Sequence, residues 1–148
     1  MSRVTKTFDA LLELKDSYAV AADAWAQVGG VAQILDLGDG LIEGDIMVDV
    51  TAIEVDSDDE DYNIIACISS TADFSSDVYA VSGLMLGSAG TAMFDNLIGD
   101  VDMGIGRYRL PFVNEIANGV TKRYLRLYTN VAGTIVTGIT YAAYLAKR

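Results

Sequence analysis

The residues best suited to chemistry are the carboxylates of one short segment, Asp56–Asp61, in which five of the six side chains are acidic. Clustered carboxylates can bind Ca²⁺ or serve as general acid and base. A calcium loop of the EF-hand type needs Gly at its sixth position and a bidentate Glu at its twelfth, and here these positions hold Asp61 and Cys67. We therefore interpret the segment as a solvated tip between two strands, which binds divalent cations only weakly.

Other residues with chemical potential are few. The chain has no His, which excludes Ser–His and Cys–His nucleophiles and His-ligated zinc. Cys67 is the only cysteine, so no internal disulfide can form, and we interpret it as a small buried hydrophobe rather than a reactive thiol. The glycine-rich segments at 38–44 (GDGLIEG) and 102–106 (DMGIG) lack the pattern of a phosphate-binding loop. We expect no enzyme, no catalytic residue, no cofactor and no metal.

One row of side chains could instead bind a partner. Tyr124, Arg126 and Tyr128 alternate along a predicted strand and share its outward face. Such a row is either an aromatic and basic binding platform or cross-strand packing beneath a second surface. The sequence leaves both interpretations open.

Composition limits the class of protein. With 148 residues, 51% of them hydrophobic, the chain is long and apolar enough for one domain with a core. It has no apolar run of the roughly 20 residues that a membrane helix needs, and its first residues lack the apolar region of a secretory signal. The lone cysteine fits synthesis in a reducing cytosol. A net charge of −11 argues against nucleic acid as a partner, and we expect no membrane partner either.

The elements that must position these residues are strands. Gly44–Ser70 contains two runs of alternating apolar residues on either side of the acidic tip, which predicts an antiparallel hairpin. In the first run the alternation slips by one residue near Thr51–Ala52, which predicts a β-bulge. One face of the second run holds Tyr62, Ile64, Ala66 and Ile68.

The last 27 residues repeat this pattern. Lys122–Val131 and Ile135–Leu145 alternate around a turn and predict a second hairpin. Ile105–Val113 is a further strand, placed at a sheet edge by Pro111, which cannot donate a ladder hydrogen bond. About eight strands with frequent turn signals predict an all-β, antiparallel, two-sheet sandwich of jelly-roll type, with an up-and-down barrel as the alternative.

The remaining segments are assigned more coarsely. Residues 5–28 could be helix, strand or an extended arm, so we place an N-terminal arm at 1–28 and a single sandwich domain at 29–148. Val31–Leu37 is predicted as a strand. Thr71–Asp77 is a loop anchored by Phe74, and the strand Val78–Leu86 requires a slip at Ser82–Gly83. Gly87–Asp102 is predicted as a loop that Met93, Phe94, Leu97 and Ile98 could hold down.

Several pieces of the sequence together resemble the jelly-roll capsid cement (decoration) proteins of tailed bacteriophages. The pieces are the N-terminal block ELKDSYAVAADAWAQ followed by ILDLG at 34–38, the ADFSS loop at 72–76, LPF at 110–112, and KRYLRLYTNVAGTIVTGITYAAYL at 122–145. Residues 84–102 depart from the pattern because they are longer and richer in glycine. The resemblance implies a virion protein, made in the host cytoplasm, that lies on the outer capsid surface and ties major capsid protein subunits together. It implies no catalytic residues.

The resemblance and the apolar N-terminal segment also predict how the chain assembles. We expect a symmetric homodimer or homotrimer that contacts the major capsid protein. The expected interface residues are Leu11, Leu12, Leu14, Trp25, Arg107, Arg109, Arg123 and Arg126. We further expect the basic strands to pair beside acidic side chains of the central strands, namely Glu43, Asp45, Asp49 or Glu54. Two alternatives stay open: a tail or baseplate structural module, and a carbohydrate-binding sandwich with Trp25, Tyr124 and Tyr128 as its aromatic row.

Overall fold

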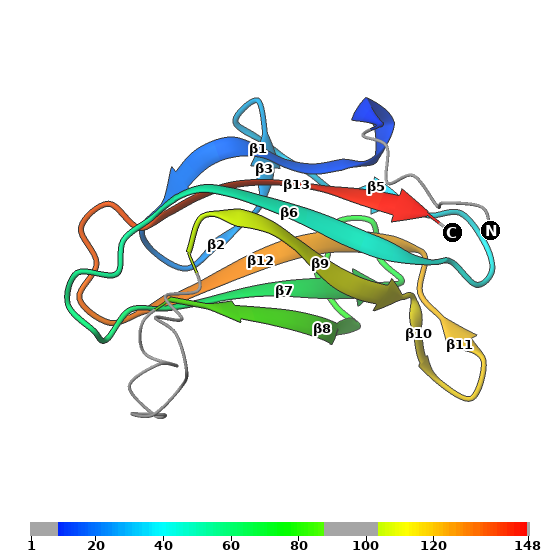
Figure 1. Ribbon diagram of the computed structural model, residues 1–148. Helices are drawn as coiled ribbons and strands as arrows, with labels where there is room; N and C mark the ends of the chain where they lie inside the picture. Colours follow the sequence, from blue (N-terminus) through cyan, green and yellow to red (C-terminus); the bar gives the residue numbers. More distant parts are fainter. Residues whose placement is uncertain (1–8, 88–103, 148) are drawn as a thin grey trace, which may run out of the picture.

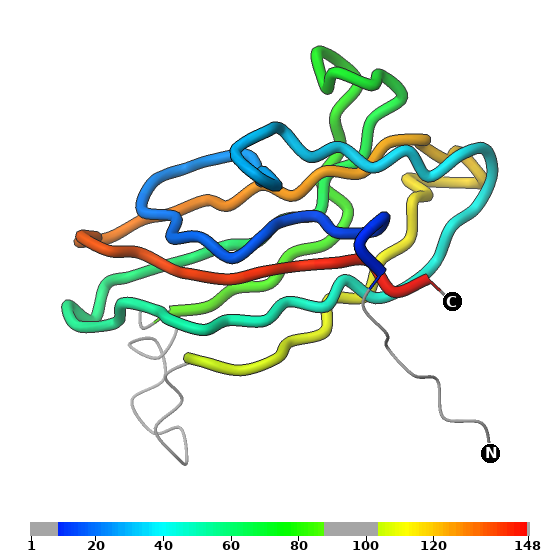
Figure 2. The backbone as a smooth tube through the Cα atoms, turned by 90° about the horizontal axis from the view of Figure 1, so that it is seen from above, coloured from blue at the N-terminus to red at the C-terminus, as the bar shows by residue number. Residues whose placement is uncertain are grey.

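Two antiparallel sheets pack face to face across one hydrophobic core (Figure 1). The computed structural model describes residues 9–87 and 104–147. The first sheet, sheet A, has the strand order β1-β13-β6-β9, which Figure 2 shows in blue, red, teal and yellow-green. Its strands are β1 (Glu13–Val20), β13 (Ile139–Lys147), β6 (Glu43–Ile53) and β9 (Gly106–Val113).

The second sheet, sheet B, has the order β2-β12-β7-β8, and β5 also pairs with β12. Its strands are β2 (Ala24–Trp25), β12 (Tyr124–Ala132), β7 (Asp61–Ser69), β8 (Val78–Leu86) and β5 (Leu35–Asp36). Two short ribbons complete the fold, β3 (Gln27–Val28) with β4 (Val31–Ala32) and β10 (Glu115–Ala117) with β11 (Val120–Thr121). A 3-10 turn, η1 (Ala10–Leu12), precedes β1.

The pairing of the eight principal strands is nested. In chain order these strands are β1, β2, β6, β7, β8, β9, β12 and β13, and the observed pairs include β1 with β13, β2 with β12, β6 with β9, and β7 with β8. The first of these strands thus pairs with the eighth, the second with the seventh, the third with the sixth and the fourth with the fifth. This is the pairing that results when one long antiparallel pair of strands is rolled into two sheets. The sandwich is therefore a jelly roll, which confirms the predicted fold class.

The core follows from the alternation of side chains along the central strands. Ile46, Val48 and Val50 of β6 point inward and meet the inward row of β7. Burying an aliphatic side chain of this size stabilises the fold by about 1.5–3 kcal/mol. The other fully buried inward residues of the long strands include Tyr62, Ile64, Ala66, Ile68, Leu125, Leu127, Ile139, Tyr141 and Leu145.

The two predicted hairpins are not hairpins. Strand β6 pairs with β13 and β9 in sheet A, whereas β7 pairs with β12 and β8 in sheet B. The acidic segment therefore connects one sheet to the other, and so does the turn between β12 and β13. Alternation identifies strands, but it does not distinguish a hairpin from a connection that crosses the core.

The predicted arm is wrong for the residues that the structure describes. Strand β1 pairs with β13 and β2 pairs with β12, so residues 13–28 supply strands to both sheets. Residues 1–8 lie outside the described residues, as does nearly all of the predicted loop 87–102. The predicted strand Val31–Leu37 is divided between β4 and β5, and the last strand begins at Ile139 rather than Ile135.

Register irregularities agree with the predicted phase slips. In the pairing of β6 with β13, Thr140 lies opposite Ala52 and Tyr141 opposite Val50, so Thr51 is the extra residue of the predicted bulge. In the pairing of β8 with β7, the extra residue is Val81, one position before the predicted slip. Pro111 lies in β9, the edge strand of sheet A, as predicted.

Candidate interaction surfaces

One end of the sandwich is held together by the side chain of Asn114. This end carries η1, the connection from β5 to β6, and the β10–β11 ribbon (Figure 1). Asn114 is fully buried; its Oδ1 accepts from the amide of Ile42 at 2.8 Å, and its Nδ2 donates to the carbonyls of Gly40 at 3.0 Å and Lys122 at 2.8 Å. A buried amide with all these partners fixes the two connections relative to each other.

Apolar side chains project from these fixed connections. Leu11 is 84% exposed, although its turn is ordered by Asp9, whose carboxylate accepts from the Leu11 amide at 2.9 Å. Leu41 and Val120 are also exposed. Large apolar side chains held in water by ordered backbone are typical of contact surfaces. We call Leu11, Leu41, Val113 and Val120 the apolar end.

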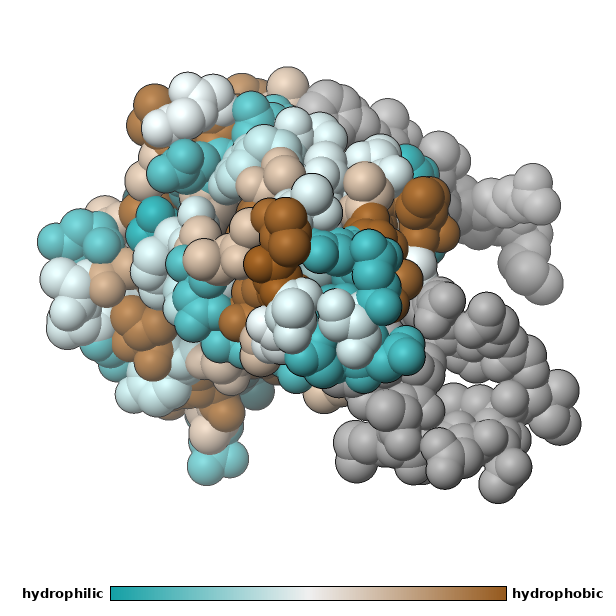
Figure 3. Space-filling view, turned by 90° about the vertical axis from the view of Figure 1, so that its left-hand side faces the viewer, coloured by the Kyte–Doolittle hydropathy of each residue, from teal (hydrophilic) through white to brown (hydrophobic). Residues whose placement is uncertain are grey.

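The opposite end is acidic, and carboxylates fix its turns. Glu54 accepts from the amides of Val136, Thr137 and Gly138 at 2.7–3.1 Å, which lowers its pKa. Gly138 has φ +79°, and a Cβ there would lie 2.0 Å from the carbonyl oxygen of Val20. The turn between β12 and β13 is thus closely fitted. In this turn Val136 is 79% exposed to solvent. Figure 3 faces this end and shows hydrophobic residues bordered by hydrophilic ones.

The acidic segment is more ordered than a solvated tip. Asp56, Asp58 and Asp59 are exposed as predicted, but Glu60 is fully buried and its Oε1 accepts from the Ser57 amide at 2.6 Å. The Asp59 carboxylate accepts from the amide and the hydroxyl of Thr134, at 3.0 and 2.8 Å. These carboxylates brace the connection between the sheets. Within residues 9–87 and 104–147, no group of three or more acidic or cysteine side chains could hold a metal ion.

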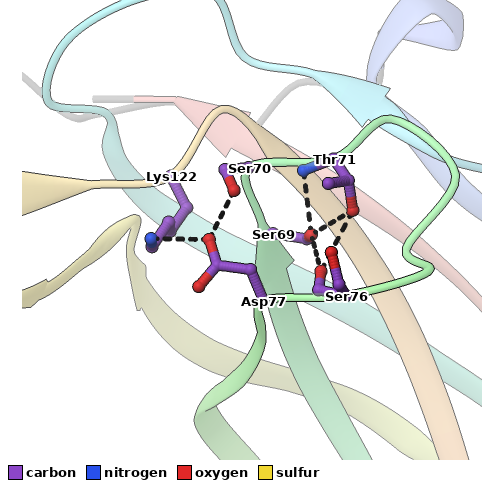
Figure 4. A network of polar contacts seen from close by, with 6 residues as sticks. All are labelled: Ser69, Ser70, Thr71, Ser76, Asp77 and Lys122. Atoms are coloured by element: carbon purple, nitrogen blue, oxygen red, sulfur yellow. Dashed lines mark hydrogen bonds and ion pairs between the residues drawn. The ribbon is translucent and has the colours of Figure 1, made fainter.

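The loop from Ser70 to Asp77 is closed by a polar network (Figure 4). Asp77 accepts from the Ser70 hydroxyl and from Lys122 Nζ, the latter at 2.7 Å, and these hydrogen bonds lower the pKa of Asp77 to about 2. Ser69 Oγ donates to the carbonyl of Ser76 at 2.8 Å. The network therefore ties the loop to Lys122, shortly before β12.

The loop places Phe74 over an aromatic cluster on the outer face of sheet B. Phe74 contacts Trp25 edge to face with ring centroids 5.7 Å apart, and Tyr128 does the same at 5.0 Å. The guanidinium of Arg126 covers the Trp25 ring at 4.7 Å. The predicted row on β12 is therefore cross-strand packing beneath a second surface. A carbohydrate platform needs a free aromatic face, whereas Arg126 covers one face of Trp25, and Phe74 and Tyr128 also contact this ring.

The predicted apolar interface residues fall into different environments. Leu11 is exposed, Leu12 is half-buried against the core, and Leu14 is a fully buried core residue of β1. Trp25 is half-buried in the aromatic cluster. Leu14 is wrong as an interface residue because its side chain points between the sheets, and Leu11 alone of the four stands clear of the sandwich.

The predicted basic residues all contact partners within the chain. Arg107 makes a bidentate pair with Asp49 at 2.6 and 3.0 Å, and Arg109 Nε lies 3.8 Å from Asp45 Oδ1, which confirms two of the expected cross-strand pairs. Arg123 makes a bidentate pair with Asp36 at 2.7 and 2.9 Å, a partner that was not expected. Burial lowers the pKa of Arg126, which stacks on Trp25.

Lys15 is the residue that sequence reasoning missed. It is fully buried in β1, and its Nζ donates to the carbonyls of Asp16, Tyr18 and Tyr141 at 2.7–3.0 Å. The rings of Tyr18 and Tyr141 lie 3.5 and 4.2 Å from Nζ. Burial lowers the pKa of Lys15 to about 7, and the charge of Asp16 opposes this shift. No sequence signal separates this lysine from a surface lysine, because its acceptors are backbone carbonyls.

Cys67 is buried on the far side of β7 from the core, and burial raises the pKa of its thiol to about 11. That environment keeps the sulfur protonated at neutral pH and therefore weakly nucleophilic. No helix in the described part of the chain is long and apolar enough to cross a membrane.

The fold and the surfaces define a jelly-roll sandwich with one apolar and one acidic end, each fixed by buried or bonded polar side chains. Comparison of the sequence with models of known families and with curated proteins found no match.

Proposed function

We propose that this chain is a capsid cement protein, a virion component that lies on the outer surface of a bacteriophage head and joins neighbouring major capsid protein subunits. The resemblance of its N-terminal block, its ADFSS loop and its last two strands to that family supports the proposal. We also propose that it acts as a symmetric oligomer, is made in the host cytoplasm, and performs no catalysis.

The observation that carries the proposal is the apolar end. Leu11, Leu41 and Val120 are exposed on ordered connections rather than on frayed ones, so little conformational entropy is lost when a partner covers them. Preorganised apolar contacts suit a protein whose task is to bind tightly and stay bound. We assign this end of the sandwich to the capsid.

The test uses two matched variants and empty heads assembled from the major capsid protein of the same genome, without cement. Leu11→Asp/Val120→Asp places two charges on the apolar end. The control Ile105→Asp/Val136→Asp places two charges on exposed apolar residues at the acidic end. Bound protein is measured by co-sedimentation, and circular dichroism checks the fold of each variant.

We expect the apolar-end variant to bind at least roughly tenfold more weakly, and the control to bind like the wild type. A wild-type chain that does not bind heads would overturn the function, and equal binding by all three proteins would overturn the assignment of the apolar end. Deletion of residues 1–28 is unsuitable as a test, because it removes β1 and β2 from the two sheets.

A further inference from the structure

Strand β8 is a long edge strand whose protection is limited to one irregularity, the extra residue Val81 in its pairing with β7. It is the last strand of sheet B, and among the described residues it pairs only with β7. The amide and carbonyl groups on its other side form a row that a further strand could bind. Its nine residues, VYAVSGLML, include no charged side chain and no proline.

The other edges of the sandwich differ from β8 in this respect. Strand β9 carries Arg107, Arg109 and Pro111, each of which discourages pairing with another strand. Strand β1 carries charged residues and two register shifts, and β2 and β5 have two residues each. Native sheets usually guard their edges with these devices, so a long neutral edge is a candidate pairing surface.

Apolar side chains and a groove accompany the free edge. Tyr79 is 41% exposed and Met85 is 56% exposed. Tyr79 lies opposite Ile68, a core residue, so it points to the inner side of sheet B, whereas Met85 lies opposite Asn63 on the outer side. On the inner side a groove of about 410 Å³ separates β8 from the edge of sheet A, and its walls include Tyr79, Val81, Pro111, Val113 and Ile116.

We propose that β8 pairs antiparallel with β8 of a second copy of this chain about a two-fold axis, joining the two sheets B into one continuous sheet. A two-fold contact satisfies both free edges at once. Side chains on the inner side of the second copy's β8 would then lie over the groove, and those on the outer side would extend the outer face of sheet B.

Charge selects a second copy as the occupant. The chain carries a net charge of −11, so two copies repel each other over most of their surface. The β8 edge is neutral along its whole length, and the acidic residue at its start, Asp77, is paired with Lys122 at 2.7 Å. Two copies can therefore approach along this edge without placing like charges together. A basic partner strand would find no acidic side chain on β8 itself, and Glu115 is the one acidic residue in the wall of the groove.

The test measures the mass of the full-length chain by sedimentation equilibrium from about 1 to about 200 µM. The edge variant is Tyr79→Lys/Met85→Lys. The control is Val31→Lys/Val136→Lys, which makes the same change in charge at two exposed apolar residues elsewhere. Both variants lower the net negative charge, so a general reduction of repulsion would favour association in both.

We expect wild type and control to be dimers in this range, and the edge variant to dissociate at least roughly tenfold more readily. Hydrogen exchange of the wild type gives a second readout, in which β8 amides become more protected as concentration rises and β9 amides do not. A monomer at the highest concentration, a trimer, or an edge variant that dimerises like the wild type would each overturn the proposal. None of these measurements involves capsids: a monomer would also overturn the proposed symmetric oligomer, whereas the assignment of the apolar end to the capsid would stand.

Discussion

At the scale of single residues, Lys15 combines two opposing effects. Desolvation favours the neutral amine, whereas the three carbonyl acceptors favour the ammonium form, because only that form has three hydrogens to donate. The rings of Tyr18 and Tyr141 also attract a cation. With a pKa lowered to about 7, desolvation is the larger effect.

This balance makes the stability of the fold depend on pH. The pKa of Lys15 is about 7 in the folded chain and 10.5 as the ordinary value, so between these values the unfolded chain binds more protons at this site. The free energy of unfolding therefore rises with pH across this window, by at most about 1.4 kcal/mol per pH unit, and the cost of burying the charge is fully present below pH 7.

Lys15→Met should remove this dependence. We expect the variant to lose about 1–3 kcal/mol through its unpaired carbonyls, but to show a flatter rise in stability between pH 7 and 9.5 than the wild type. Urea unfolding at a series of pH values measures both effects. Lys147→Met, the same substitution at an exposed lysine, is the matched control. Parallel wild-type and Lys15→Met curves would show that Lys15 is charged in the fold throughout this range.

At the scale of elements, the connections between the sheets depend on carboxylates that accept from backbone amides. Glu54, at the end of β6, binds three successive amides of the turn that leads into β13. In the connection from β6 to β7, Glu60 accepts a hydrogen bond from the Ser57 amide. Asp59, in the same connection, accepts from the Thr134 amide in the turn between β12 and β13. Amide donors lower the pKa of Glu54 and of Asp59, so these two side chains bind the turn most strongly while they are ionised.

Glu54→Gln should loosen the turn between β12 and β13 without disturbing the sheets. The pKa of Glu54 is lowered from 4.5 in the fold, so its contribution is complete above pH 4.5 and is lost as pH falls through the folded value. We expect a lower melting temperature than wild type at pH 7, a difference that shrinks on acidification, and faster amide exchange at Val136, Thr137 and Gly138. Asp56→Asn, a change at an exposed carboxylate nearby, is the control. Unchanged exchange at these three amides would contradict the role of Glu54.

The same connections show where sequence reasoning succeeds and fails. Alternation identified the inward rows of β6 and β7 and the bulge at Thr51, because these depend on local spacing. Alternation did not reveal that β6 and β7 belong to different sheets. A hairpin within one sheet and a connection between two sheets bury the same faces of the two strands. Residues 13–28 were ambiguous because β1 buries a lysine, and β2 and β3 have only two residues each.

The candidate surface was predictable to a similar extent. The pairing of Arg107 with Asp49 follows from the expected proximity of basic and acidic strands, whereas composition does not separate the exposed Leu11 from the buried Leu14. The contacts of Asn114 and Glu54 do not, because most of their partners are backbone groups 72 to 84 positions away. Such contacts exist only once the two sheets have been assembled.

At the scale of the whole molecule, charge is sorted into local pairs within a strongly acidic chain. Arg107 and Arg123 each make a bidentate pair with a carboxylate, and Arg109 lies near Asp45. The Arg123 guanidinium holds the pKa of Asp36 at about 2. These arginines therefore form ion pairs with carboxylates of the same chain. They offer a partner less unpaired positive charge than the number of arginines indicates.

It follows that attachment to heads should depend little on attraction between opposite charges. Raising the salt from about 0.1 to about 1 M shortens the Debye length from ~10 to ~3 Å and screens exposed charges, while burial of the apolar end is unaffected or strengthened. We expect binding to cement-free heads to stay constant or tighten over this range, and Arg107→Gln/Arg109→Gln and Arg123→Gln/Arg126→Gln to bind like the wild type. Co-sedimentation at each salt concentration measures this. A roughly tenfold loss of binding at high salt, abolished by either double substitution, would show instead that these arginines leave their intramolecular partners to contact an acidic capsid surface.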